Sequence, residues 1–111
     1  MFRIADILDA ISKVQSYTES INFDTFTADR KTVDAVIRNL IIIGEAASHI
    51  PDDICEANAD IPWKDMKAMR NFVVREYFGV SDNVLRETVQ VDLPPLVSLL
   101  KSLMEKQGTE T

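Results

Sequence analysis

The stretch "AVIRNLIIIGEAASHIP", residues 35–51, decides the fold class because its apolar residues recur at the spacing of an α-helix. A core-facing stripe falls within about 40° of Leu40 on a helical wheel. This stripe consists of Val33, Val36, Leu40, Gly44 and Ala47. The spacing therefore predicts a long helix from about Asp29 to about Ile50, and Pro51 is expected to end it.

The opposite face of this helix mixes polar and apolar side chains. Arg38, Glu45 and His49 lie near the opposite pole, and three consecutive isoleucines, residues 41–43, cover the centre and both flanks. A monomer would expose much of this apolar surface, so a homodimer is predicted; the alternative is that the isoleucines pack against the protein's own helices. Arg38 and Glu45 form either a solvated face or the support of a polar site near the dimer axis. His49 is expected to be a surface histidine rather than a ligand or base.

Apolar residues at helical spacing recur along the rest of the chain, without the alternation typical of strands and without repeats. Helices are predicted at about 2–17, at about 62–78, from Ser81 or Asp82 onward, and from Leu96 to about 103, with short helical turns inside the connectors 22–31 and 51–63. Gly79 suits a left-handed C-cap, and Pro95 is expected to interrupt the chain at "DLPPL", residues 92–96. The predicted fold class is all-α, an antiparallel bundle of four to five helices. One domain is expected at residues 1–104, followed by a flexible tail at 105–111.

The composition limits the classes of function. The 111 residues suit one compact domain, and twelve basic against eighteen acidic residues give a net charge of −6. Any contact with nucleic acid must therefore come from a local basic patch. The single Cys55 cannot form an internal disulfide and has no neighbours at zinc-ligand spacing. Charged residues interrupt the N-terminal run, so neither a signal peptide nor a membrane span is indicated, and a cytoplasmic protein is expected.

A second stretch, "MRNFVVREYFGV" at residues 69–80, places two arginines and a tyrosine in a helical, mostly apolar run. Arg70 and Tyr77 share a helix face about 20° apart, whereas Arg75 lies about 140° from Arg70 and close to Asn71. The arginines converge on one ligand most easily if two copies of this helix meet at a two-fold axis and line a shared cleft. Because arginine presents paired donors that match phosphate oxygens, such a cleft would suit a phosphodiester.

A plainer alternative is that these side chains belong to the surface of a helical scaffold with no nucleotide connection. Arg70 and Arg75 would then pair with acids such as Asp65, Glu76 or Glu87. The tyrosine would be a half-buried aromatic with a hydrated hydroxyl.

Four ordered segments carry a family resemblance: "AVIRNLIIIGEAASHIP" at 35–51, "IPWKDMKAMRN" at 61–71, "REYFGV" at 75–80 and "VQVDLPPL" at 89–96. In this order the chain resembles the HepT-like proteins of the HEPN superfamily, from about Ile4 to about Leu100. The resemblance implies an all-α homodimer. For active members it implies an endoribonuclease toxin that needs no metal or other cofactor, encoded beside a minimal nucleotidyltransferase antitoxin in a type VII (HEPN/MNT) toxin-antitoxin system.

The family's motif reads Arg, four residues, His, one residue, Tyr. Arg70 matches the arginine, Asn71 the polar residue after it, and Tyr77 the tyrosine, while Arg75 occupies the histidine position. The resemblance therefore implies that Arg70, Asn71 and position 75 act on RNA in the dimer cleft. It also implies that Tyr77 is the residue the antitoxin modifies with adenylate.

The arginine at position 75 departs from that motif with a chemical consequence. Arginine stays a cation, with a pKa above about 12, so it can stabilise phosphoryl charge but does not exchange protons as histidine does. Loss of a positioned acid or base costs about 10² to 10⁴ in rate, which predicts an impaired nuclease. The alternative is a non-catalytic or detoxified protein that serves as binding partner and adenylylation substrate. An engineered change, a spontaneous one and a natural non-catalytic member all remain open origins of Arg75.

Overall fold

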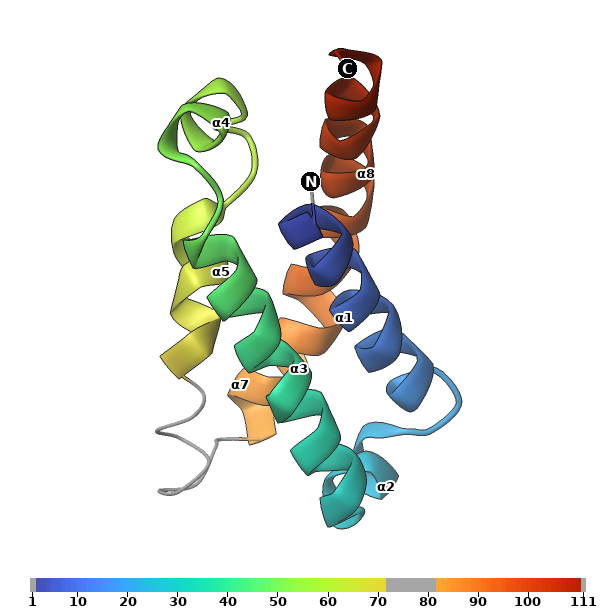
Figure 1. Cartoon of the computed structure of the whole chain (residues 1–111). Coiled ribbons are helices and arrows are strands. Elements are labelled where there is room, and N and C mark those ends of the chain that lie inside the picture. Colours follow the sequence, from blue (N-terminus) through green and yellow to red (C-terminus); the bar gives the residue numbers. More distant parts are fainter. Residues whose placement is uncertain (1, 72–81, 111) are drawn as a thin grey trace.

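The computed structural model describes residues 2–71 and 82–110, and the side chains of residues 4–71 and 83–106. Every regular element in these ranges is helical, and they contain no strand (Figure 1). In chain order the elements are α1 (Phe2–Thr18), α2 (Phe23–Ala28), α3 (Arg30–Ser48), α4 (Asp52–Ala57), α5 (Trp63–Ala68), the 3₁₀ turn η1 (Met69–Asn71), α7 (Asp82–Glu87), the π-helical turn η2 (Thr88–Asp92) and α8 (Leu93–Glu110). The predicted all-α class is confirmed.

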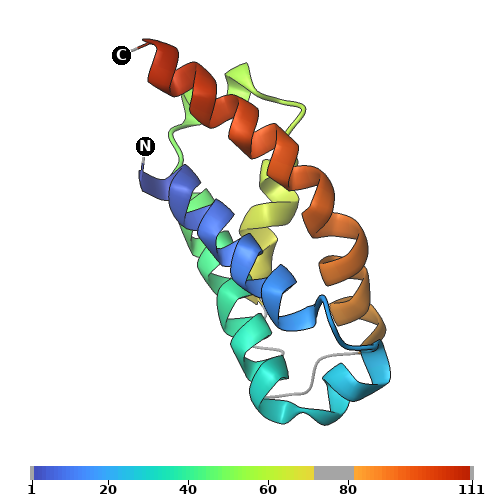
Figure 2. The ribbon, with the colours of Figure 1, turned by 90° about the vertical axis from the view of Figure 1, so that its right-hand side faces the viewer.

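The long segments alternate in direction along the molecule. α1, α3, the α5–η1 segment and the α7–η2–α8 segment run up and down in turn (Figures 1 and 2). α3 is central, because it packs against α1 on one side and against α5 and η1 on another, while α8 packs against α1. The connectors from α1 to α3 and from α3 to α5 each contain a short helix, α2 and α4. The homodimer stays a prediction.

A single apolar core runs through these segments. Its largest fully buried side chains include Ile4, Ile7, Ile11, Leu40, Ile43, Met66, Leu85, Leu93, Leu100 and Leu103. The isoleucine run of α3 divides as a helix requires: Ile43 is buried, Ile41 is half-buried, and Ile42 remains 38% exposed. No helix within residues 2–71 and 82–110 is both long and apolar enough to cross a membrane.

Side-chain caps explain where α3 begins. The Asp29 carboxylate accepts hydrogen bonds from the backbone nitrogen of Thr32 over 3.3 Å and from its hydroxyl over 2.7 Å. These bonds satisfy amide hydrogens that have no partner inside the first turn. The helix ends at Ser48 with His49 as its C-cap, shortly before Pro51. The predicted helix at about 29–50 is confirmed within the usual uncertainty of helix ends.

The helix predicted at about 62–78 is observed only in its first part. α5 begins at Trp63, directly after Pro62, and the chain tightens into η1 at Met69. The later part of that prediction, including the Gly79 cap, lies outside the described residues.

The expected interruption at "DLPPL" is wrong. The Leu93 nitrogen donates to the carbonyl oxygen of Thr88, five residues earlier, so the chain passes through a π-helical turn directly into α8. Pro94 and Pro95 then lie in the first turn of α8, where a missing N–H is tolerated. α8 continues to Glu110, so residues predicted to form a flexible tail from 105 are helical that far. The division of the chain at residue 104 stays a prediction.

Candidate functional site

Arg70 and Asn71 stand at the end of a helical segment whose other face is buried. Trp63, Met66 and Met69 recur every three residues along α5 and η1, with exposed fractions of 7%, 0% and 6%. The Trp63 indole Nε1 donates a hydrogen bond over 3.0 Å to the carbonyl oxygen five residues earlier, which ties the segment to the preceding turn. Since these anchors face the core, Arg70 and Asn71 are left exposed at the surface.

The backbone of η1 rests directly on α3 at Gly44. A Cβ atom placed on Gly44 would overlap the backbone nitrogen of Arg70, and it would lie 3.0 Å from the carbonyl carbon of Met69 and 3.1 Å from Arg70 Cα. Glycine lacks this atom, so it permits a backbone approach that every other residue would obstruct. This close contact holds the Cα of Arg70, from which its exposed side chain extends, against the central helix α3.

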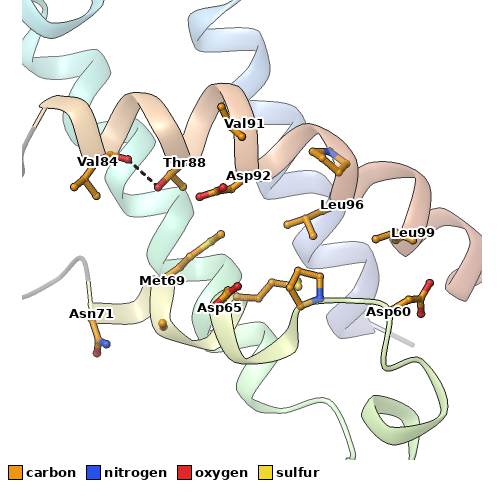
Figure 3. A pocket seen from close by; sticks show the side chains of 14 residues that line it. Asp60, Asp65, Met69, Asn71, Val84, Thr88, Val91, Asp92, Leu96 and Leu99 are labelled. Carbon is orange, nitrogen blue, oxygen red and sulfur yellow. Dashed lines mark hydrogen bonds between the residues drawn. The ribbon is translucent and has the colours of Figure 1, made fainter.

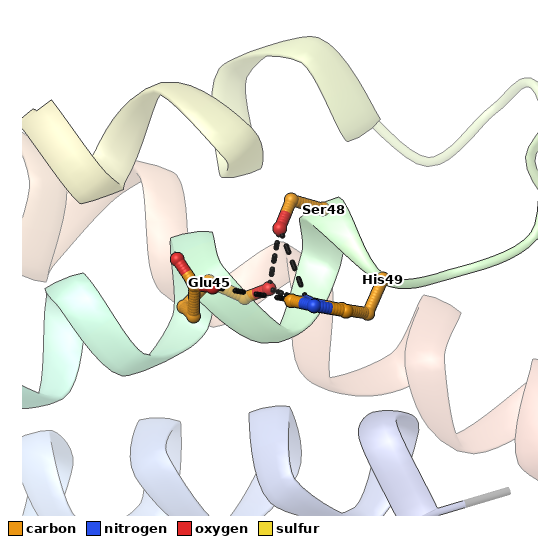
Figure 4. Close-up of polar contacts among 3 residues, drawn as sticks. All are labelled: Glu45, Ser48 and His49. Atoms are coloured by element: carbon orange, nitrogen blue, oxygen red, sulfur yellow. Dashed lines mark hydrogen bonds and ion pairs between the residues drawn. The ribbon is translucent and has the colours of Figure 1, made fainter.

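The outer face of α3 carries the other polar residues singled out from the sequence. Arg38, Glu45 and His49 are all exposed, as the helical wheel predicts. His49 Nδ1 lies 2.8 Å from the Glu45 carbonyl oxygen and 3.9 Å from its carboxylate, and Ser48 Oγ donates to the same carbonyl over 2.6 Å (Figure 4). Because a carbonyl oxygen only accepts, His49 Nδ1 carries a proton in this contact.

These hydrogen bonds cap the C-terminal end of α3, a common role for a surface histidine at a helix C-terminus. The expectation for His49 is confirmed to that extent. Within the described ranges Arg38 makes no hydrogen bond or ion pair, which agrees with a solvated face. The alternative role of Arg38 and Glu45 beside a dimer axis stays a prediction.

A pocket of about 540 Å³ lies between the α5–η1 segment and the α7–η2–α8 segment (Figure 3). Its lining includes the buried Met66, Met69 and Leu96. Three carboxylates, Asp60, Asp65 and Asp92, also contribute to the lining. Among the described residues no basic side chain lines it. Asn71 belongs to this lining whereas Arg70 does not, so the two neighbours serve different surfaces.

The acidic pocket is a poor place for a phosphate. Burial, and after it the charges of Glu87 and Asp65, raise the pKa of the Asp92 carboxyl above its ordinary value of 3.8. This mutual repulsion between carboxylates would equally oppose another anion. Among the described residues, an external anion is therefore better accommodated at Arg70 than at these carboxylates.

The described residues also include one cysteine, Cys55. Burial raises the pKa of the Cys55 thiol, and the opposing charge of Lys67 is a smaller effect, so the thiol is protonated at neutral pH. No three His, Cys, Asp or Glu side chains of residues 4–71 and 83–106 gather closely enough to hold a metal ion.

Two of the predicted site residues, Arg75 and Tyr77, lie outside the described residues. The structure thus places Arg70 and Asn71 side by side on η1. Within the described ranges no hydrogen bond or ion pair joins them to Arg38 or Glu45. The sequence assigns Gly44 only to the core stripe. An isolated glycine inside a strong helical pattern was the available signal, because such a residue costs stability unless packing requires it.

The described residues define a small all-helical protein with an exposed arginine and an exposed amide at the end of a helical segment whose other face is buried, an arrangement suited to contact phosphate. A family model described as "Ribonuclease HepT-like" matches residues 7–103. The chain belongs to this HepT-like ribonuclease family.

Two relatives illustrate the likeness. The chain is 42% identical over 100 residues to "Probable ribonuclease HepT" of Thermococcus cleftensis, covering 90% of this chain and 91% of the relative. It is 31% identical over 100 residues to "Putative RNase MJ0127" of Methanocaldococcus jannaschii, covering 90% of this chain and 83% of that protein. No solved structure matches the chain significantly.

Proposed function

We propose that the chain is the toxin component of a HEPN/MNT toxin-antitoxin system, built as a metal-independent endoribonuclease and impaired by Arg75. The observation that carries the proposal is the exposed Arg70, which has no ion pair within the described residues, in a chain whose family is named for ribonucleases. A guanidinium that is exposed, and that no described carboxylate pairs with, is available for an external anion. The family motif assigns it to RNA.

The proposed reaction needs proton transfer at two oxygens. A base takes the proton of the ribose 2′-hydroxyl, whose oxygen attacks the adjacent phosphorus, and an acid protonates the 5′ oxygen as its bond to phosphorus breaks. Arg70 would bind the phosphoryl oxygens, and Asn71 would donate a hydrogen bond nearby. Histidine at position 75 could serve as base or acid, whereas Arg75 supplies charge alone.

The test is to restore the motif and express the protein in cells. The Arg75→His variant should slow growth and degrade cellular RNA, while the chain with Arg75 should do so far less. Adding Arg70→Ala should abolish the effect. Adding Arg30→Ala should not, because Arg30 opens α3 fourteen residues before Gly44, about 20 Å away along the helix. Normal growth and intact RNA with the restored motif would contradict the proposal.

The proposed cleft requires two copies of the chain. In this proposal the partner copy covers the exposed Ile42 on α3 and contributes its own Arg70 and Asn71. Analytical ultracentrifugation should give twice the chain mass of 12.5 kDa at micromolar concentration. A monomer would support the plain helical scaffold instead.

The second candidate function is that of binding partner and substrate of a nucleotidyltransferase, and the arginine at position 75 is the observation that favours it. The Tyr77 phenol oxygen would attack the α-phosphorus of ATP, lose its proton and release pyrophosphate, leaving adenylate on the ring. The added negative charge beside the arginines would repel RNA.

Intact-mass measurement after incubation with the partner enzyme and ATP tests this second candidate. One adenylate should be gained, and Tyr77→Phe should prevent it. Tyr17→Phe is the matched control and should leave the gain intact, because Tyr17, 41% exposed on α1, lies outside the motif. No gain, or a gain that survives Tyr77→Phe, would contradict the assignment.

A further inference from the structure

The contact between α3 and η1 is one of backbone against backbone. Gly44 lies on the buried face of α3, with the fully buried Leu40 one turn before it. At Gly44 itself the peptide that joins Met69 to Arg70 occupies the space where a side chain would begin. The missing atom therefore sets how closely the turn that carries Arg70 approaches the central helix.

The buried side chains of the α5–η1 segment fix the turn in the remaining directions. Met66 and Met69 are 0% and 6% exposed and hold the segment against the core. Arg70 follows Met69 directly, within a turn of three residues. The Arg70 Cα is thus restrained by its contact with Gly44 of α3 and by the buried Met69 next to it, while the Arg70 side chain is exposed to solvent.

We infer that Gly44 is a positioning residue for Arg70, and that its lack of a side chain sets where the guanidinium meets a phosphodiester. This inference rests on the proposed ribonuclease function for its consequence, although not for its geometry. Adding a methyl group at Gly44 must push η1 away from α3, since the obstructing atoms are backbone and cannot rotate aside. A displacement of about 1 Å at a catalytic group can cost about 100-fold in rate.

The test compares three proteins that all carry Arg75→His: the parent, Gly44→Ala and Ile37→Val. Ile37, only 3% exposed on the same helix, lies about two turns before Gly44. Its substitution removes one methyl group from the core and adds no atom where Gly44 meets η1. Two-dimensional ¹⁵N–¹H NMR reports backbone displacement, thermal melting reports stability, and cleavage of a single-stranded RNA well below both melting points reports function.

Gly44→Ala should shift the amide resonances of residues 69–71 more than any others outside α3, and it should lower the cleavage rate about 10- to 100-fold. Ile37→Val should lower the melting temperature yet leave both the 69–71 resonances and the cleavage rate unchanged. A merely structural role would make the two variants alike.

Two results would overturn the inference: resonance shifts confined to α3 in Gly44→Ala, or cleavage as fast as that of the parent. If the parent itself cleaves no RNA, the proposed function fails. The pattern of amide shifts then decides separately whether Gly44 sets the position of Arg70.

Discussion

Replacing Gly44 by alanine sets two opposing effects on stability against each other. Alanine is about 0.8–1.0 kcal/mol more favourable than glycine inside a helix, so the substitution would stabilise an unobstructed α3. Here the new methyl would overlap the Arg70 backbone nitrogen and crowd two further backbone atoms at 3.0 and 3.1 Å. Overpacking a rigid interior costs about 1–3 kcal/mol. Since rigid backbone forms the obstacle, we expect the cost near the upper end and a net loss of about 1–2 kcal/mol.

Thermal unfolding followed by circular dichroism measures this difference. A domain of this size loses about 4–8 °C per kcal/mol, so Gly44→Ala should melt at least about 4 °C below the parent. Gly108→Ala makes the same chemical change inside α8 and serves as the control, with an unchanged or higher melting temperature expected. A Gly44→Ala protein that melts at or above the parent temperature would refute the close backbone approach.

Three further predictions concern single contacts. Hydrogen bonding to Thr32 lowers the pKa of the Asp29 carboxyl, so Asp29→Ala should lower the melting temperature at pH 7. This difference between variant and parent should vanish as the pH falls through that lowered pKa. Asp29→Ser caps the helix without a charge, so its stability should not show this loss with pH. Burial beside other acids raises the pKa of the Asp92 carboxyl, so its charged form opposes folding at neutral pH. Asp92→Asn should therefore raise the melting temperature by about 2 °C at most. This gain should disappear below pH 3.8, where the carboxyl is protonated in both the folded and the unfolded chain. Trp63→Phe loses the indole hydrogen bond and should cost about 1 kcal/mol in denaturant titration, whereas an unchanged midpoint would show that the bond contributes nothing.

The sequence was sufficient for the helices that bury one face. α1 and α3 carry regular apolar stripes, and the structure places both within a few residues of the predicted bounds. The prediction of a helix break at Pro94 and Pro95 is wrong, because it considers only the two prolines and their neighbours. The hydrogen-bond pattern of the chain already changes at Thr88, ahead of both prolines. That change depends on how the whole segment packs.

The candidate site was predictable only as a motif. Arg70 and Asn71 are exposed on η1, within the helix predicted at about 62–78. The roles of Arg75 and Tyr77 remain predictions from the family resemblance. The glycine at position 44 signals a close approach inside a helix, but the sequence does not say which segment makes that approach, since no local pattern encodes where two segments cross. The sequence did not predict the acidic pocket either, because Asp65 and Asp92, which both line it, are distant in the sequence.

The most direct measurement of the central claim is the initial rate at which purified protein cleaves single-stranded RNA in the presence of a metal chelator. The Arg75→His protein should cleave about 10² to 10⁴ times faster than the chain with Arg75, and adding Arg70→Ala should remove the gain. Equal rates for the two chains, or cleavage that is indifferent to Arg70, would contradict an arginine-dependent ribonuclease site on η1.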